Sequence, residues 1–95
     1  MNKIEVLESI KRVGIVPIVR VEQTEQAFAA VEAVKAGGID VFEITLTTPN
    51  AVRIIEELQT RFGDAILLGA GTVLDAETAR ICVLAGAKFI DEKVN

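Results

Sequence analysis

The chain has 95 residues, of which 51% are hydrophobic, and its mean hydropathy of +0.42 provides the apolar material for one small domain. A formal charge of −4 without any basic cluster argues against a nucleic-acid-binding surface. No stretch approaches the roughly 20 apolar residues of a membrane span, and the first residues lack the apolar core of a signal peptide. We therefore expect a soluble cytoplasmic protein that binds neither nucleic acid nor membrane.

The range of side chains available for acid–base chemistry and metal binding is narrow. There is no histidine, so acid–base chemistry falls to carboxylates, lysines or water. The single cysteine, Cys82, lies in a helical apolar pattern, which predicts a small buried hydrophobe rather than a metal ligand or a disulfide partner. We expect no metal site and no cofactor.

Apolar residues at intervals of three predict an amphipathic helix over residues 4–13, ahead of the first strand. The compact apolar run of residues 15–20 then predicts a buried strand. Thr24 is a good N-cap for the next helix, which the glycine pair at residues 37–38 ends. Residues 40–46 are typical of a second strand.

The rest of the chain continues this alternation. A helix, a strand, a helix and a strand are expected over residues 48–62, 66–70, 75–85 and 88–90. Thr48 followed by Pro49 predicts an N-cap with proline at the first helical position, and Asp75 is a good N-cap for the last helix. Strands that alternate with helices of this length predict an α/β fold in which right-handed crossovers join parallel strands.

Glu43 places a charge in the middle of a segment that otherwise has the composition of a buried strand. Successive strand side chains point to opposite faces, so Phe42 and Ile44 share one face while Glu43 and Thr45 share the other. An ionised carboxylate is almost never buried unless another group pairs with it or a reaction uses it. The alternatives for Glu43 are therefore a catalytic role and a structural ion pair with Arg20.

Further polar residues fall where the predicted strands end, which is where ligands gather in α/β proteins. Arg20 follows the first strand, Glu43 and Thr47 lie on the second, and Thr72 follows the third in a GAGT sequence. An arginine suits a carboxylate or a phosphate, a desolvated glutamate can transfer protons, and glycines allow close backbone approach. These residues are candidates for a binding or catalytic site.

Three segments resemble a known enzyme family. Residues 18–20 (IVR), 42–49 (FEITLTTP) and 69–73 (GAGTV) are similar to the first half of 2-keto-3-deoxy-6-phosphogluconate (KDPG) aldolase, in a family that also covers 4-hydroxy-2-oxoglutarate aldolase. The similarity extends over residues 4–90. The glutamate segment and the glycine segment at this spacing are specific together, although neither would be alone.

The resemblance implies a TIM (β/α)8 barrel and a class I aldolase, which works through a lysine Schiff base with pyruvate. The reaction would be the reversible cleavage of a phosphorylated keto-deoxy sugar acid to pyruvate and glyceraldehyde 3-phosphate. By resemblance, Glu43 matches the glutamate that shuttles protons and Thr72 matches a threonine that contacts the pyruvyl group. Arg20 matches an arginine near the substrate in some members. Thr47 stands where other members carry a substrate-binding arginine.

A whole barrel needs eight strands and typically about 250 residues. We therefore expect residues 1–95 to form a single half-barrel domain, truncated relative to the family. It would contain about four parallel strands, three crossover helices and an N-terminal helix. The Schiff-base lysine of the family belongs to a later strand. Lys88 lies at the wrong end of its strand and Lys93 is a tail residue, so we expect no turnover from the chain alone.

Two other functions remain open from the sequence. Exposed strand edges invite pairing with another chain, so one alternative is a non-enzymatic half-barrel fragment or design that self-associates into a homo-oligomer. The other is a weak binder of carboxylates or phosphates, which would use Arg20 and the turn at residues 71–72.

Overall fold

In the computed structural model residues 16–92 are described, and the helix expected over residues 4–13 lies outside them. The strands are β1 (Ile18–Val19), β2 (Val41–Thr45), β3 (Leu67–Val73) and β4 (Phe89–Glu92). The helices are α2 (Thr24–Ala36), α3 (Ala51–Phe62) and α4 (Ala76–Ala85), and a short 3-10 helix, η1 (Gly63–Ala65), follows α3. The predicted alternation of strands and helices is confirmed within this part of the chain.

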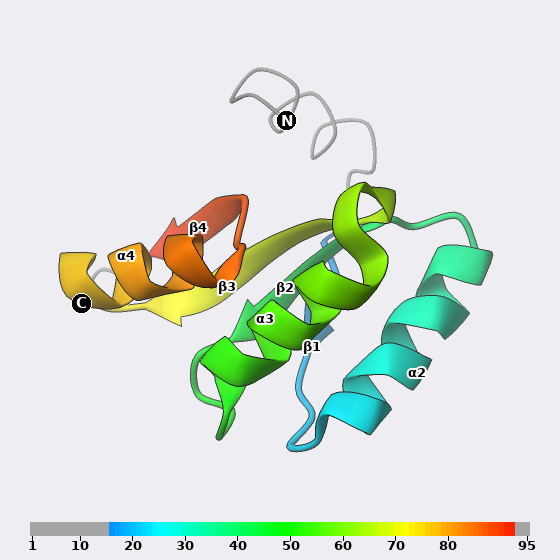
Figure 1. Cartoon of the computed structure of the whole chain (residues 1–95), viewed down its shortest axis with the longest axis horizontal. Coiled ribbons are helices and arrows are strands. Elements are labelled where there is room, and N and C mark those ends of the chain that lie inside the picture. The colour runs from blue at the N-terminus through cyan, green and yellow to red at the C-terminus, as the bar shows by residue number, and fades with distance from the viewer. Residues whose placement is uncertain (1–15, 93–95) are drawn as a thin grey trace.

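The strands form one parallel sheet in the order β1-β2-β3-β4. Figure 1 shows α2, α3 and α4 in one layer over the same face of this sheet. Sequential strands with every helix on one side are the arrangement of consecutive β/α units in a barrel, whereas a doubly wound sheet carries helices on both faces. The prediction of four parallel strands with three crossover helices, as in the first part of a TIM barrel, is confirmed.

The layer between the sheet and the helices is an apolar core. Phe42 and Ile44 of β2 point into it with at most 1% of their surface exposed, and Leu68 and Ala70 of β3 are fully buried beside them. Buried helical side chains complete the core, among them Val31, Ile54, Ile55, Leu58 and Cys82. The face predicted for β2 is confirmed, since Leu46 packs against this cluster as well.

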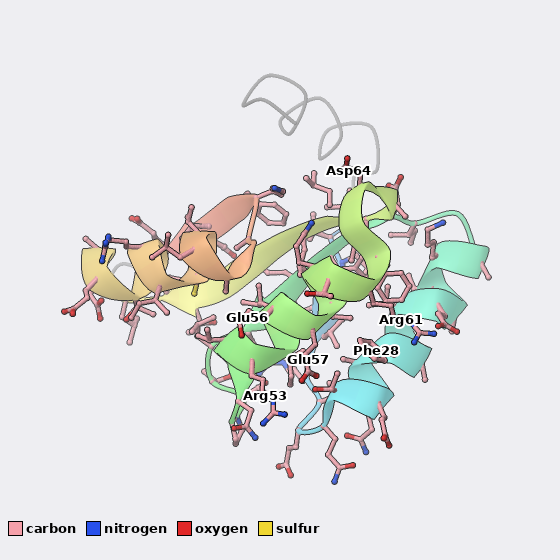
Figure 2. The ribbon with its side chains drawn as sticks, in the orientation of Figure 1. Phe28, Arg53, Glu56, Glu57, Arg61 and Asp64 are labelled. Atoms are coloured by element: carbon pink, nitrogen blue, oxygen red, sulfur yellow. The ribbon has the colours of Figure 1, made fainter. Side chains whose placement is uncertain are left out.

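Helices α2 and α3 meet through aromatic rings and an arginine (Figure 2). Phe28 and Phe62 lie edge to face, with ring centroids 6.1 Å apart. The guanidinium of Arg61 lies 4.7 Å from the centroid of Phe28, and its Nη2 donates to Oε1 of Glu32 at 2.8 Å. Both charged side chains are about half exposed, so their ion pair contributes at most about 1 kcal/mol. The ring pair and the Arg61 guanidinium over the Phe28 ring therefore stabilise this junction together with the ion pair.

The N-terminus of α2 differs from the prediction by one residue. The N-cap is Gln23, which makes no side-chain capping bond, and Thr24 is the first helical residue. The Thr24 side chain lies near Glu57 of α3 and lowers the pKa of that carboxyl. Thr24 therefore faces a neighbouring helix instead of capping its own.

Helix α3 begins at Ala51 rather than at Pro49, so the prediction of Thr48 as its N-cap is wrong. The N–H of Thr48 donates to the carbonyl of Thr45 at 3.1 Å, in a turn that follows β2. Asn50 occupies the N-cap position with a φ of 61°, a left-handed conformation that asparagine tolerates better than most residues. The turn delays the first helical hydrogen bonds until the chain has passed Pro49.

Strand β3 is longer than predicted and β1 is shorter. The prediction that the third strand ends at residue 70 is wrong, because β3 continues to Val73 and Gly71 pairs in register with Thr45 of β2. Pro17 has no N–H to give to a strand ladder, and its carbonyl accepts from the N–H of Glu43 at 2.9 Å. Regular pairing of β1 therefore starts only after this proline.

Candidate functional site

The sheet face opposite the helices is polar where β2 ends. Glu43 and Thr45 lie on this face and pair in register with Gly69 and Gly71 of β3. Glu43 is 7% exposed and Thr45 is 1% exposed. The carboxylate is not an isolated charge in the structure. Polar groups are buried only where they have partners or a chemical use. Glu43 and Thr45 are therefore the first two residues of the candidate site.

The absence of a side chain at Gly71 makes room for the Glu43 carboxylate. A Cβ at residue 71 would collide with Oε1, Cδ and Cγ of Glu43. The carboxylate therefore lies directly against the backbone of Gly71, on the strand next to its own. Glycine leaves the space for this close approach, and a side chain at residue 71 would require Glu43 to move.

Towards the amino ends of the strands the same face is apolar. Val41 and Leu67 are buried there and pack with Val16 and Phe89. The ring of Phe89 lies against Gly69, where a Cβ would collide with three of the ring carbons. The polar part of this face is therefore confined to the carboxyl ends of β2 and β3.

A β-bulge turns Thr72 onto the polar face. The pairing of β3 with β4 shifts between Gly71 and Val73, and Thr72 has a φ of 59°. In an unbroken strand Thr72 would follow Ala70 onto the helix-facing side. Instead Val73 enters the apolar core, with 1% of its surface exposed, and the Thr72 hydroxyl reaches Thr45. Bulges re-aim side chains in this way and are frequent beside active sites.

Three threonine hydroxyls gather at this end of the sheet. Oγ1 of Thr45 lies 2.9 Å from Oγ1 of Thr47 and 3.3 Å from Oγ1 of Thr72. The backbone N–H of Thr47 donates to the same Thr45 oxygen at 3.4 Å. We call Thr45, Thr47 and Thr72 the threonine cluster. Hydroxyls both donate and accept hydrogen bonds, so the cluster can bind a carboxylate or a carbonyl oxygen next to Glu43.

Arg20 lies at the edge of an open pocket beside the threonine cluster. This pocket has a volume of about 220 Å³ and is lined by Arg20, Val21, Glu22, Thr47, Thr48 and Pro49. Arg20 is exposed, which leaves its planar fork accessible to a carboxylate or phosphate. Thr47 borders both this pocket and the threonine cluster, so the two features are continuous.

The described lysines lie at the other end of the sheet. Lys35 is in the last turn of α2, shortly before β2 begins, and Lys88 directly precedes β4, where its N–H donates to the carbonyl of Leu68 at 2.7 Å. In parallel strands these positions are at the amino ends, opposite the threonine cluster. Lys93 lies outside the described residues.

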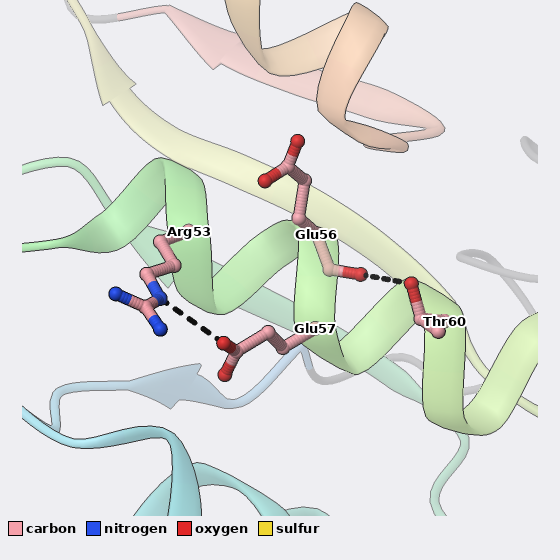
Figure 3. Close-up of polar contacts among 4 residues, drawn as sticks. All are labelled: Arg53, Glu56, Glu57 and Thr60. Atoms are coloured by element: carbon pink, nitrogen blue, oxygen red, sulfur yellow. Dashed lines mark hydrogen bonds and ion pairs between the residues drawn. The ribbon is translucent and has the colours of Figure 1, made fainter.

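Outside the candidate site, the surroundings of three side chains shift their pKa values. The side chain of Thr24 and then Arg53 lower the pKa of the Glu57 carboxyl, and Arg53 Nε donates to that carboxylate at 3.1 Å (Figure 3). The backbone N–H of Thr78 lowers the pKa of Asp75, which caps α4 as predicted. Burial raises the pKa of the Cys82 thiol.

Across residues 16–92 no metal-binding group of three acidic or Cys side chains occurs, and no helix there is long and apolar enough to span a bilayer.

The structure gathers the residues singled out in the sequence at one end of the sheet. Glu43 lies over Gly71, and Thr47 and Thr72 meet through Thr45. Arg20 joins them through the pocket that it shares with Thr47. Thr45 was not among the predicted site residues, although it follows Glu43 by two positions and strand alternation places both on one face.

The sequence matches a known family along most of its length. The family model described as KDPG and KHG aldolase covers residues 6–92. The chain is 38% identical over 87 residues to the 2-dehydro-3-deoxy-phosphogluconate aldolase of Treponema pallidum, which covers 92% of this chain and 41% of that protein. It is 40% identical over 83 residues to the KHG/KDPG aldolase of Escherichia coli, covering 86% of this chain and 38% of that protein.

Solved structures agree in fold. A KDPG aldolase from Legionella pneumophila, with pyruvate captured as a covalent carbinolamine intermediate, superposes with a TM-score of 0.75 at 41% identity, covering 79% of this chain and 36% of that one. The 2-keto-3-deoxy-6-phosphogluconate aldolase of Zymomonas mobilis ZM4 with 3-phosphoglycerate gives a TM-score of 0.79 at 30% identity, covering 90% and 40%. This chain thus spans well under half the length of the relatives that it matches.

Proposed function

The chain belongs to the KDPG and KHG aldolase family, and on that premise we propose that it supplies the pyruvate-holding and proton-transferring part of a class I aldolase site. The reaction is the reversible cleavage of 2-keto-3-deoxy-6-phosphogluconate to pyruvate and glyceraldehyde 3-phosphate. The observation that carries the proposal is the buried Glu43 carboxylate, which lies against Gly71 beside the threonine cluster.

Glu43 is the acid–base group in this proposal. In the direction of bond formation, pyruvate bound to a lysine as an iminium loses a proton from its methyl carbon and becomes an enamine. Glu43 accepts that proton and passes it to the aldehyde oxygen as the enamine carbon attacks the carbonyl carbon. In cleavage Glu43 takes the proton from that hydroxyl as the carbon–carbon bond breaks, and then delivers it to the enamine carbon. A buried carboxylate that lies against the Gly71 backbone at the carboxyl ends of the strands suits this exchange.

Thr72 and Arg20 would hold the anionic parts of the substrate. The Thr72 hydroxyl reaches the polar face next to Glu43, which suits contact with the pyruvyl group. Arg20 and Thr47 line the open pocket beyond it, and this pocket suits a more distant carboxylate or phosphate. The weak anion binder considered from the sequence is thus part of the same proposal.

The nucleophilic lysine is not supplied by residues 1–95 in this proposal. Lys35 and Lys88 lie at the amino ends of the strands, away from Glu43. The chain alone should therefore give no covalent adduct when it is incubated with pyruvate and borohydride. An increase in intact mass by one reduced pyruvate would overturn this part of the proposal, since it would identify a working Schiff-base lysine within the chain.

A chimera tests the role of Glu43. It joins this chain to the part of the Escherichia coli KHG/KDPG aldolase that lies beyond the aligned 83 residues, and pyruvate release is measured. We expect turnover, and we expect Glu43→Gln to lower kcat by roughly 100-fold or more, the usual contribution of general acid–base catalysis. Glu56→Gln, which changes an exposed carboxylate on α3, is the matched control. A folded chimera without turnover, or one in which the two variants are equally active, contradicts the proposal.

Self-association is a second candidate, and two observations favour it. α4 carries three exposed apolar side chains, Ile81, Val83 and Leu84, of which Leu84 is 72% exposed. Within residues 16–92, β1 and β4 each pair on one side only. Sedimentation of the chain gives its mass directly. A concentration-dependent dimer or larger species supports a homo-oligomer, and a monomer at all concentrations contradicts it.

A further inference from the structure

Thr45 is the buried centre of the threonine cluster, and we infer that it is a positioning residue for the pyruvate site. Its hydroxyl sets the direction in which the Thr47 and Thr72 hydroxyls present hydrogen atoms to the bound 2-oxo acid. This inference rests on the proposed function, because it concerns the ligand that the same site would hold.

Burial separates Thr45 from its two partners. Thr45 is 1% exposed, whereas Thr72 is partly buried and Thr47 is exposed. A ligand on the polar face can therefore reach Thr47 and Thr72 but has no access to the Thr45 hydroxyl. Thr45 can act on a ligand only through the side chains that it touches.

The hydrogen-bond capacity of Thr45 restricts the arrangement of hydrogens. A threonine hydroxyl has one hydrogen to donate and two lone pairs that accept. The Thr45 oxygen has three polar neighbours: the N–H of Thr47 at 3.4 Å, the Thr47 hydroxyl at 2.9 Å and the Thr72 hydroxyl at 3.3 Å. One lone pair accepts from the N–H, so Thr45 donates to one of the two hydroxyls and accepts from the other.

The direction in which Thr45 donates its hydrogen determines which neighbouring hydroxyl can donate to a ligand. When Thr45 donates to Thr72, the Thr72 hydrogen is free to bind a carboxylate or carbonyl oxygen of the ligand, while Thr47 donates to Thr45. The reverse arrangement leaves Thr47 as the free donor. An anionic ligand beside Thr72 favours the first arrangement, so Thr45 converts a freely rotating hydroxyl into an oriented donor.

The backbone of Thr72 gives an independent reason. Thr72 combines a β-branched side chain with a φ of 59°, a conformation that persists only where surrounding contacts favour it and that is concentrated at functional sites. Without the bulge the Thr72 side chain would point into the helix-facing core. The contact with Thr45 is the polar interaction that this strained conformation makes possible.

Three variants separate positioning from a purely structural role. Thr45→Val removes the hydroxyl with little change in shape, and Thr45→Ser keeps the hydroxyl. Thr60→Val is the matched control, because the Thr60 hydroxyl donates to the carbonyl of Glu56 at 2.9 Å on the surface of α3, away from this site (Figure 3). Each variant is made in the 95-residue chain with isotope-labelled threonine methyl groups.

Two readouts are taken from each variant. The first is the position of the Thr47 and Thr72 methyl resonances without ligand. The second is the dissociation constant for pyruvate, with acetate as the control anion. We expect Thr45→Val to shift both resonances and to weaken pyruvate binding by about fivefold, the effect of losing one oriented hydrogen bond. Thr45→Ser should restore binding to within about twofold, and Thr60→Val should change neither readout.

The outcomes distinguish this inference from the proposed function. Pyruvate binding that is equal in Thr45→Val and Thr60→Val overturns the inference while the proposed site stands. If the unmodified chain does not bind pyruvate, the proposed pyruvate site fails and the inference fails with it. Where the unmodified chain binds, ligand-free resonances that shift in Thr45→Val and return in Thr45→Ser support positioning by Thr45. Unshifted resonances contradict it.

Discussion

The two faces of β2 are buried to nearly the same extent, yet they are built in different ways. On the face that meets the helices, Phe42 and Ile44 are at most 1% exposed and contact apolar side chains. On the other face, Glu43 and Thr45 are 7% and 1% exposed and lie beside glycine and hydroxyl groups. Burial alone therefore does not locate the candidate site. The chemical nature of the neighbouring groups distinguishes the two faces.

The difference between the faces lies in what surrounds each side chain. The helix-facing side is filled by large apolar groups from three helices, so a change in volume there alters stability. The other side is shaped by two glycines that leave space for Phe89 and Glu43. A change there alters which groups a ligand meets. Substitutions on the two faces should therefore have separable effects on stability and on ligand binding.

Phe42→Ala should cause the largest loss of stability. It removes a fully buried ring from the helix-facing core, and truncations of this kind cost about 3–5 kcal/mol. Leu84→Ala is the control, because Leu84 is 72% exposed and surface changes usually stay within about 0.5 kcal/mol. Urea unfolding measures both. Equal midpoints for the two variants would contradict the description of the core.

Gly69→Ala and Gly71→Ala test the sheet face opposite the helices with the same chemical change in its apolar part and in its polar part. The Cβ at residue 69 meets the ring of Phe89, so we expect a loss of about 1–3 kcal/mol from overpacking. The Cβ at residue 71 meets the flexible end of Glu43, which can move. Gly71→Ala should therefore lose less stability in urea but more pyruvate affinity by titration. The opposite ranking of the two variants would show that these contacts have been assigned wrongly.

Thr72→Gly should leave stability nearly unchanged while it weakens ligand binding. Glycine relieves a left-handed conformation that costs about 1–2 kcal/mol, and its extra freedom in the unfolded chain offsets about 0.5–1 kcal/mol of that gain. Loss of the hydroxyl should reduce pyruvate affinity, whereas Thr72→Ser should retain it. A Thr72→Gly variant that unfolds much earlier in urea would contradict the assignment of strain at this residue.

Asp75→Asn should have the smallest effect, and only in acid. The Thr78 backbone N–H lowers the pKa of Asp75 below its ordinary value of 3.8. The ionised Asp75 cap therefore stabilises the folded state above pH 3.8, and this contribution is lost as the pH falls through the lower folded-state pKa. Asparagine also caps helices, so the variant should match the parent in urea at pH 7 and lose less stability on acidification. Asp64→Asn serves as the control, and an identical acid response in the parent and Asp75→Asn would refute the effect.

Much of the fold follows from local patterns in the sequence. Gly37 ends α2 as expected, Gly63 and Gly86 end α3 and α4 in the same way, and Asp75 caps α4 with its side chain. Alternation along β2 places Phe42 in the core and Glu43 on the other face. These features depend on backbone geometry within a few residues, so they can be inferred without knowledge of distant contacts.

Other features were decided only by tertiary contacts. Thr24 lies near Glu57 of another helix instead of capping its own. β3 continues through its glycines because β2 and β4 pair with it on both sides. Thr72 reaches the polar face because of a bulge in the pairing with β4. The sequence by itself determined the alternation of elements and the buried charge at Glu43, because these follow from local periodicity. The tertiary structure alone decided that Thr45 joins Thr47 to Thr72, because that contact spans 27 positions in the chain and requires two strands in register.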